Sequence, residues 1–295
     1  MDTAAPTPAQ AANERNRLLH LTLDALKVFN VTNLVCNTKS GRFLLDINDS
    51  IISRHLMLYG HFEHDQVQQW LSFVDLKGGS GTMLDIGSNI GSTSIPLGLQ
   101  KKFSRIFCFE PDPKNFQALE FNIKINDLVQ SVVAVQTAIG SVDEPVTFEL
   151  SNDNYGDHRI SYGLQTGGMY NEQARKKITV PCSRLDTEIA RNGIDINELV
   201  LIKCDSQGSE GHVFRGASSL LGRRQVPWVI EFWPYGLQRS GITPDEMNAI
   251  IRKYFSTFIE FGEGGQVQPV KPVDMFETLY AKYTGDTFCN VLLQP

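Results

Sequence analysis

Three short stretches that are apolar nearly throughout constrain the fold of this chain most. They cover residues 82–86, 105–110 and 199–204, and segments with helical periodicity follow each of them. A strand that is apolar on both faces is typical of a parallel sheet with helices packed on both sides. Alternation of such strands with helices indicates a doubly wound α/β sheet.

The last two predicted strands, "STFIEF" and "TFCNVLLQ", indicate a different pairing near the C-terminus. The segment between them shows no clear helix, and a parallel pair usually needs one. We therefore expect an antiparallel strand at the C-terminal edge of the sheet. The domain organisation that we predict is a disordered tail over residues 1–15, a helical or mixed cap over 16–78, and an α/β domain over 79–295.

Composition narrows the classes of partner. The formal net charge is −6, from 27 Lys and Arg against 33 Asp and Glu. A nucleic-acid-binding surface is therefore not expected. No apolar run reaches the roughly 18 residues of a membrane helix, so no membrane partner is expected. The five cysteines are scattered, which favours a reducing compartment, and we predict a cytoplasmic protein. A homo-oligomer is compatible with all of this.

The segment "LDIGSNIG" after the first strand indicates a ligand-binding turn. Gly87 and Gly91 lie four residues apart, and a helix follows, so backbone N–H groups are free to meet a ligand. The dinucleotide pattern G-x-G-x-x-G is absent. Asp85 precedes the turn, and its carboxylate repels a pyrophosphate but suits an ammonium group. A ligand with an amino acid moiety, such as S-adenosyl-L-methionine, fits better than a nicotinamide cofactor.

Glu110 ends the second strand 23 residues after Gly87. A carboxylate about 20 residues beyond the glycine turn binds ribose hydroxyls in nucleoside-binding α/β folds. Pro111 turns the chain out of the strand and leaves Glu110 at its tip. The two features together predict a nucleoside site.

Four segments together resemble the class I S-adenosylmethionine-dependent methyltransferases, and specifically the FkbM family. They are "LDIGSNIGSTS", "FCFEPDPKNFQALEFNIKIN", "LIKCDSQGSEGHVFRGA" and "VIEFWP", in this order, and the resemblance covers roughly residues 45 to 292. It implies a Rossmann-like, mostly parallel seven-stranded sheet. It also implies that the 85–92 turn holds the methionine end, that Glu110 holds the ribose, and that the Ala138-Ile139 turn holds the adenine. The cofactor-binding residues expected are Asp85, Gly87, Ser88, Asn89, Gly91, Ser92, Glu110, Pro111, Ala138, Ile139 and Asp205.

Asp205 and Glu231 end strands that we expect to be neighbours, and they are candidates for the reacting end of the site. A hydroxyl acceptor needs help to lose its proton. The two carboxylates can act as a general base and its orienting partner, or can bind a cation such as Mg²⁺. The family pattern K-I-D-x-E-G-x-E reads here with Gln207 in place of its first glutamate, which removes a charge.

The polar segment 151–176 is long for a loop in a compact domain and is predicted to shape the acceptor pocket. His158 within it is a candidate general base, and Trp233 and Tyr235 follow the fifth strand. We predict a methyltransferase that acts on a hydroxyl of a sugar or other small molecule. The alternatives are a nicotinamide-dependent oxidoreductase on a similar sheet and a methyltransferase-like domain that binds without catalysis.

Overall fold

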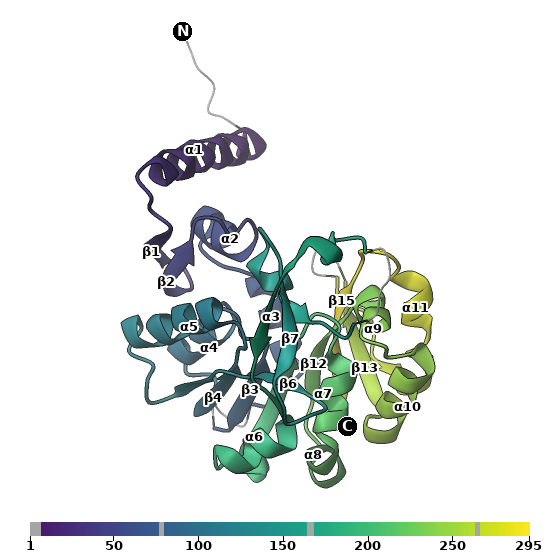
Figure 1. The fold of residues 1–295 in the computed structure, drawn as a ribbon. Helices are drawn as coiled ribbons and strands as arrows, with labels where there is room; N and C mark the ends of the chain where they lie inside the picture. Colours follow the sequence, from purple (N-terminus) through teal and green to yellow (C-terminus); the bar gives the residue numbers. More distant parts are fainter. Residues whose placement is uncertain (1–6, 77–79, 164–167, 263–265) are drawn as a thin grey trace.

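A large mixed sheet forms the centre of the computed structural model, which describes residues 7–76, 80–163, 168–262 and 266–295 (Figure 1). Eight described strands build it. In spatial order they are β14 (Lys271–Pro272), β13 (Thr257–Phe261), β15 (Cys289–Gln294), β12 (Trp228–Phe232), β11 (Leu199–Cys204), β3 (Thr82–Ile86), β4 (Arg105–Phe109) and β5 (Val132–Val135). The strands from β12 to β5 are mutually parallel, so their carboxyl ends lie along one edge.

The C-terminal part of the sheet differs from the prediction. β13 and β15 pair antiparallel, as predicted, but β15 lies between β12 and β13 and not at the edge. The two-residue strand β14 takes the edge beside β13, so the sheet has eight described strands and not seven. The segment before β15 contains the short helices η6 (Val273–Met275) and α11 (Thr278–Lys282). These elements are too short to show a period in the sequence.

Side chains of each parallel strand alternate between two apolar cores. In β3, Leu84 and Ile86 join one cluster, while Met83 joins the other. The first cluster is closed by α6 (Leu185–Arg191), α7 (Glu210–Gly216), α8 (Ser218–Arg223), α9 (Pro234–Arg239), α10 (Pro244–Tyr254) and α11. The second is closed by α2 (Ile52–Tyr59), α3 (His64–Leu71), α4 (Ser94–Leu99) and α5 (Pro113–Ile125). Helices therefore cover both faces, as the apolar strands predicted.

The N-terminal part begins with the helix α1 (Pro8–Val28), which Figure 1 shows beyond α2 and away from the sheet. Thr7 and Gln10 form a reciprocal capping box, and a proline follows the cap, so the sequence starts a helix at residue 8. The predicted tail is therefore wrong for residues 8–15, and residues 1–6 lie outside the described residues. The hairpin of β1 (Asn33–Thr38) and β2 (Gly41–Asp46) follows.

Two smaller sheets lie beside the carboxyl ends of the parallel strands. β7 (Val146–Leu150) pairs antiparallel with β8 (Arg159–Ile160) and β9 (Lys176–Val180), and β6 (Ala138–Gly140) pairs parallel with β10 (Cys182–Arg184). The segment "SVVAVQTAIG" thus forms two strands, β5 and β6, in two different sheets. The predicted loop 151–176 contains η2 (Tyr155–Asp157), β8 and η3 (Glu172–Ala174), and its residues 164–167 lie outside the described residues. The 3-10 helix η4 (Ile196–Glu198) precedes β11.

Candidate active site

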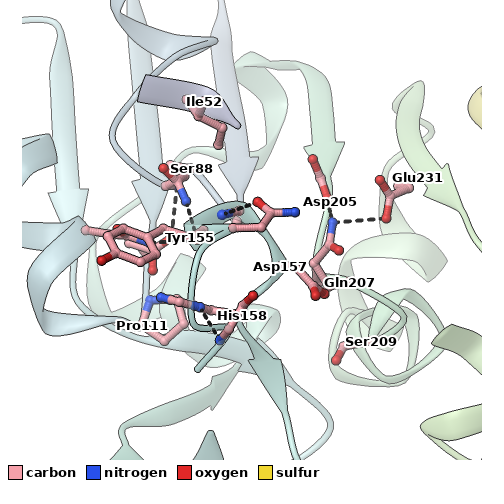
Figure 2. A pocket seen from close by; sticks show the side chains of 18 of the residues that line it. Ile52, Ser88, Pro111, Tyr155, Asp157, His158, Asp205, Gln207, Ser209 and Glu231 are labelled. Carbon is pink, nitrogen blue, oxygen red and sulfur yellow. Dashed lines mark hydrogen bonds between the residues drawn. The ribbon is translucent and has the colours of Figure 1, made fainter. Parts of the chain in front are cut away.

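The principal cavity of the described residues lies at the carboxyl ends of β3, β4, β11 and β12 and has a volume of about 470 Å³ (Figure 2). Ligands of open α/β sheets bind at this edge. Most of the residues predicted to bind the cofactor or to act in catalysis line this cavity. These are Gly87, Ser88, Asn89, Ser92, Glu110, Pro111, Ala138, Ile139, His158, Asp205 and Glu231.

The turn after β3 lies tightly against the end of β11. Gly87 has a φ of +79°, and a Cβ atom on it would lie 1.8 Å from the backbone oxygen of Asp205. No side chain fits there, and glycine adopts this φ without strain. Asn89 also has a positive φ, of 51°, which asparagine tolerates better than most residues. The conformations of Gly87 and Asn89 let the turn pack against the end of β11, and the two segments together form one wall of the cavity.

Glu110 joins this turn to the tip of β4. Its two carboxylate oxygens accept the backbone N–H of Asn89 at 2.9 Å and of Asp112 at 2.8 Å. Burial raises the pKa of Glu110 to about 8, although the two N–H donors favour its charged form. A carboxylate has about four acceptor positions, so Glu110 can accept further hydrogen bonds from the cavity side.

Asp85, which was predicted to bind the cofactor, does not line the cavity. It is fully buried, one of its carboxylate oxygens accepts the Ser94 hydroxyl, and the other lies 3.6 Å from the Lys203 ammonium. Gly91 lies outside the cavity wall too, with a φ of +86°. Asp85 therefore supports the turn from beneath, because the chain leaves β3 with this side chain directed toward α4.

Gln207 connects the two carboxylates that were predicted at the reacting end (Figure 2). Its side-chain amide donates to Asp205 at 2.8 Å and to Glu231 at 3.0 Å. β11 and β12 are adjacent and parallel, as predicted, which brings Asp205 and Glu231 to one rim. Burial, followed by the charges of Asp205 and Glu210, raises the pKa of Glu231 well above its ordinary value. The rim therefore holds a basic, partly desolvated carboxyl group.

Lys203 lies beneath this rim and partly balances its charge. Its ammonium lies 3.4 Å from Asp205 and 3.6 Å from Asp85. Burial opposes the charge on Lys203, but the carboxylates around it outweigh burial and raise its pKa. Glu63, which precedes α3, also lines the cavity, and burial raises its pKa to about 7.

His158 lines the cavity, but its hydrogen bond does not suit the predicted role as general base. Its Nδ1 accepts the backbone N–H of Ser151 at 3.0 Å. In the neutral ring the proton then resides on Nε2, so the free nitrogen is a donor. Burial lowers the pKa of His158, which favours this neutral form.

The chain matches the family profile "Methyltransferase FkbM domain" over residues 85–258, which is more than half of its length. The chain belongs to the FkbM methyltransferase family. This membership supports methyltransferase function, and the oxidoreductase alternative is not retained. The cavity lies at the carboxyl ends of strands within the matched region, so the family region and the site coincide.

Individual relatives are distant from this FkbM methyltransferase. Methyltransferase sdnD of Sordaria araneosa is 24% identical over 182 residues, which is 55% of this chain and 68% of the relative. The solved methyltransferase FkbM from Methylobacillus flagellatus KT is 16% identical with a TM-score of 0.44, over 73% of this chain and 44% of that one. TrmK of M. capricolum, solved with S-adenosyl-homocysteine, is 10% identical with a TM-score of 0.36, over 78% and 67%. The chain thus spans less than half the length of the Methylobacillus protein.

The predicted Mg²⁺ site is not supported in this FkbM methyltransferase. In the part of the chain that the structure describes, no group of three or more His, Cys, Asp or Glu side chains could hold a metal ion. Asp205 and Glu231 instead accept hydrogen bonds from Gln207, and Lys203 supplies a positive charge near Asp205.

Sequence reasoning missed two features of the FkbM methyltransferase site. The backbone oxygen of Tyr155 accepts the side-chain amides of Asn89 at 2.9 Å and Asn115 at 3.1 Å, which holds η2 beside the Gly87 turn and α5. Glu63 comes from the N-terminal cap. The sequence offers no local signal for either feature. The two hydrogen bonds to Tyr155 join residues 40 and 66 apart in the chain, and Glu63 precedes the other residues of the cavity wall by more than 20 positions, apart from Ile51, Ile52 and Phe62.

Among the residues that the structure describes, no helix is both long and apolar enough to cross a membrane.

Proposed function

We propose that this FkbM methyltransferase transfers a methyl group from S-adenosylmethionine to a hydroxyl group of a small molecule, such as a sugar or natural product. One observation carries the proposal. A single cavity is lined on one side by the Gly87 turn and Glu110, and on the other by the linked carboxyl groups of Asp205 and Glu231. A nucleoside site and a proton acceptor thus face the same space.

The residues on the first side suit S-adenosylmethionine. Glu110 is buried, lines the cavity and keeps acceptor capacity for the ribose hydroxyls. The polar residues Ser88, Asn89 and Ser92 would hold the methionine end, while Ala138, Ile139 and Pro111 offer apolar surface to the adenine. When bound, this cofactor supplies an electrophilic methyl group on a sulfonium.

On the opposite side, Glu231 would accept the proton of the acceptor hydroxyl. Its raised pKa makes it a stronger base than an ordinary carboxylate, and general bases contribute about 10²- to 10⁴-fold to rate. Gln207 fixes the orientation of this carboxyl group through its 3.0 Å hydrogen bond. Asp205 orients the Gln207 amide and would lie beside the cofactor. His158, which was predicted as a base, would instead donate a hydrogen bond to the ligand through Nε2.

The net charge of −6 supports a small-molecule acceptor over nucleic acid, and the scattered free cysteines, four of them buried, support a cytoplasmic location. A second candidate function is binding without catalysis. Its support is Gln207, an uncharged residue at a position where the family pattern has a glutamate.

Calorimetry with S-adenosylhomocysteine, followed by methyl transfer to a panel of hydroxylated sugars and phenols, tests the proposal. We expect micromolar binding and turnover of at least one hydroxyl compound. Failure to bind S-adenosylhomocysteine would refute the cofactor assignment. Binding without turnover on any hydroxyl or amine compound would favour the non-catalytic function.

A further inference from the structure

A second cavity, of about 220 Å³, adjoins the first one behind Gln207. Gln207 and Ile160 line both cavities, so the two share a wall. The rest of its lining comes from β7, β8, η3, β9 and α9 and from the residues that directly follow β8 and α9. We call it the arginine cavity and define it by Arg159, Lys177, Gln207 and Arg239.

Cationic groups exceed anionic ones in the wall of the arginine cavity. Arg159, Lys177 and Arg239 face two carboxylates, Glu149 and Glu172. The contacts are long: Arg239 lies 3.4 Å from Glu149 and 3.5 Å from Glu172, and Lys177 lies 3.5 Å from Glu149. Asp157, which also contacts Arg159, is paired separately with Arg175. One positive charge therefore remains in the wall.

Arginine donors in this wall lack acceptors. Among the described residues, Nε and Nη1 of Arg159 are buried and have no hydrogen-bond partner, and Nε of Arg239 makes only the 3.5 Å ion-pair contact with Glu172. Arg159 is only 2% exposed, so bulk water does not supply hydrogen-bond acceptors to its guanidinium group. An unpartnered buried donor is costly, and more so when it is charged. The wall therefore has the donors for an acceptor group that carries negative charge.

The guanidinium of Arg159 is also held in place. Its Cζ lies 5.2 Å from the ring centre of Trp233 and 5.5 Å from that of Tyr170, within the range of cation–π contacts. Arg239 is anchored by Glu149 and Glu172. A planar guanidinium that is already oriented suits a carboxylate or phosphate, because the arginine side chain loses little conformational entropy when the anion binds.

The geometry points to the arginine cavity as the subsite for an anionic oxygen group, a carboxylate or phosphate, on the methyl acceptor. This inference rests on the proposed function, since it places the acceptor hydroxyl near Glu231 and its anionic end behind Gln207. The uncharged amide of Gln207 fits such an acceptor. A glutamate there would add a third carboxylate beside Asp205 and Glu231 and would repel the anion.

The test is binding of benzoate, benzamide and phenyl phosphate, measured by calorimetry with protein saturated with S-adenosylhomocysteine at low salt. We expect benzoate or phenyl phosphate to bind about tenfold more tightly than benzamide, the effect of a charged hydrogen bond. The tighter of the two anions identifies the group. Equal binding of all three compounds would overturn the inference.

Two adjacent lysines provide a matched pair of variants. Lys177 lines the arginine cavity and is half exposed, whereas Lys176 precedes it in β9 and does not line the cavity. We expect Lys177→Gln to weaken binding of the anion about threefold, which is the size of a half-exposed charge contact, and Lys176→Gln to leave it unchanged. Equal effects of the two variants would refute a site in this cavity.

Arg239→Gln is expected to weaken binding of the anion about tenfold. Circular dichroism checks its fold, and the lysine pair decides the question if this variant is unfolded. Affinity for S-adenosylhomocysteine is measured in parallel. If that ligand binds and the anions do not, only this inference fails, whereas loss of S-adenosylhomocysteine binding in the wild type contradicts the proposed function.

Discussion

Two acidic residues at the ends of neighbouring strands have different surroundings, and this separates their roles. Asp85 lies near the end of β3, and Glu110 directly follows β4. The two strands are adjacent and parallel. Asp85 is enclosed by Ser94 and Lys203, while Glu110 accepts two backbone N–H groups and lines the cavity. Of the two residues, only Glu110 lines the cavity.

Replacement of Glu110 by alanine should weaken cofactor binding. We expect the affinity for S-adenosylhomocysteine to fall by at least about 1 kcal/mol, the net value of a typical hydrogen bond. Calorimetry measures it, with Glu144→Ala, a change at an exposed residue, as the control. An unchanged affinity in Glu110→Ala would remove the ribose role.

Glu231→Gln tests the proton acceptor. The amide keeps the shape of the side chain but cannot take a proton, so we expect kcat to fall about 100-fold while S-adenosylhomocysteine still binds. In the wild type, kcat/KM should rise with pH through the raised pKa of Glu231, since only its ionised form accepts a proton. The variant should lose this rise. Activity near that of the wild type would exclude Glu231 as the base.

Contacts between secondary-structure elements shape the site as much as its side chains do. The turn after β3 and the end of β11 approach each other at Gly87, and Gly208 in the next turn lies against the backbone of Gly236. The sequence predicted the first of these turns from its glycine spacing. It did not show that glycine is required because another strand end lies against it.

Gly87→Ala should therefore destabilise the protein. The new Cβ would lie 1.8 Å from the Asp205 oxygen at a φ of +79°, and overpacking typically costs about 1–3 kcal/mol. Urea unfolding measures the free energy of unfolding. Gly222→Ala is the control, because Gly222 lies in α8 with open space around its Cβ position, and alanine there should stabilise by about 0.5–1 kcal/mol. Equal stability of both variants would contradict the close approach.

The molecule as a whole buries several carboxyl groups in and next to the candidate active site, and this affects its stability. Burial raises the pKa of Glu110 to about 8 and that of Glu210 to about 7. A carboxyl group with a raised pKa in the folded state binds its proton more tightly there than in the unfolded chain. Its contribution to stability is complete below the unfolded value near 4.5 and is lost as pH rises through the folded value.

We expect the wild type to lose stability between pH 5.5 and 8, by about 1–2 kcal/mol more than Glu210→Gln, since glutamine cannot ionise. The histidines titrate equally in both proteins and cancel in the difference. Urea unfolding at several pH values measures it, with Glu144→Gln, a change at an exposed residue, as the control. Parallel pH profiles of wild type and Glu210→Gln would exclude a raised pKa for Glu210.

The alternation of strands and helices, the turn at Gly87 and the carboxyl groups at the strand ends follow from the sequence. Each depends on local patterns, namely apolar runs, glycine spacing and polar residues at strand ends, and these reach only a few residues. The position of β15, the burial of Asp85, the bridge from Gln207 to Asp205 and Glu231, and the arginine cavity depend on contacts between distant segments. Such contacts are set by how the helices and sheets pack, so only the tertiary structure decides which acidic residue lines the cavity.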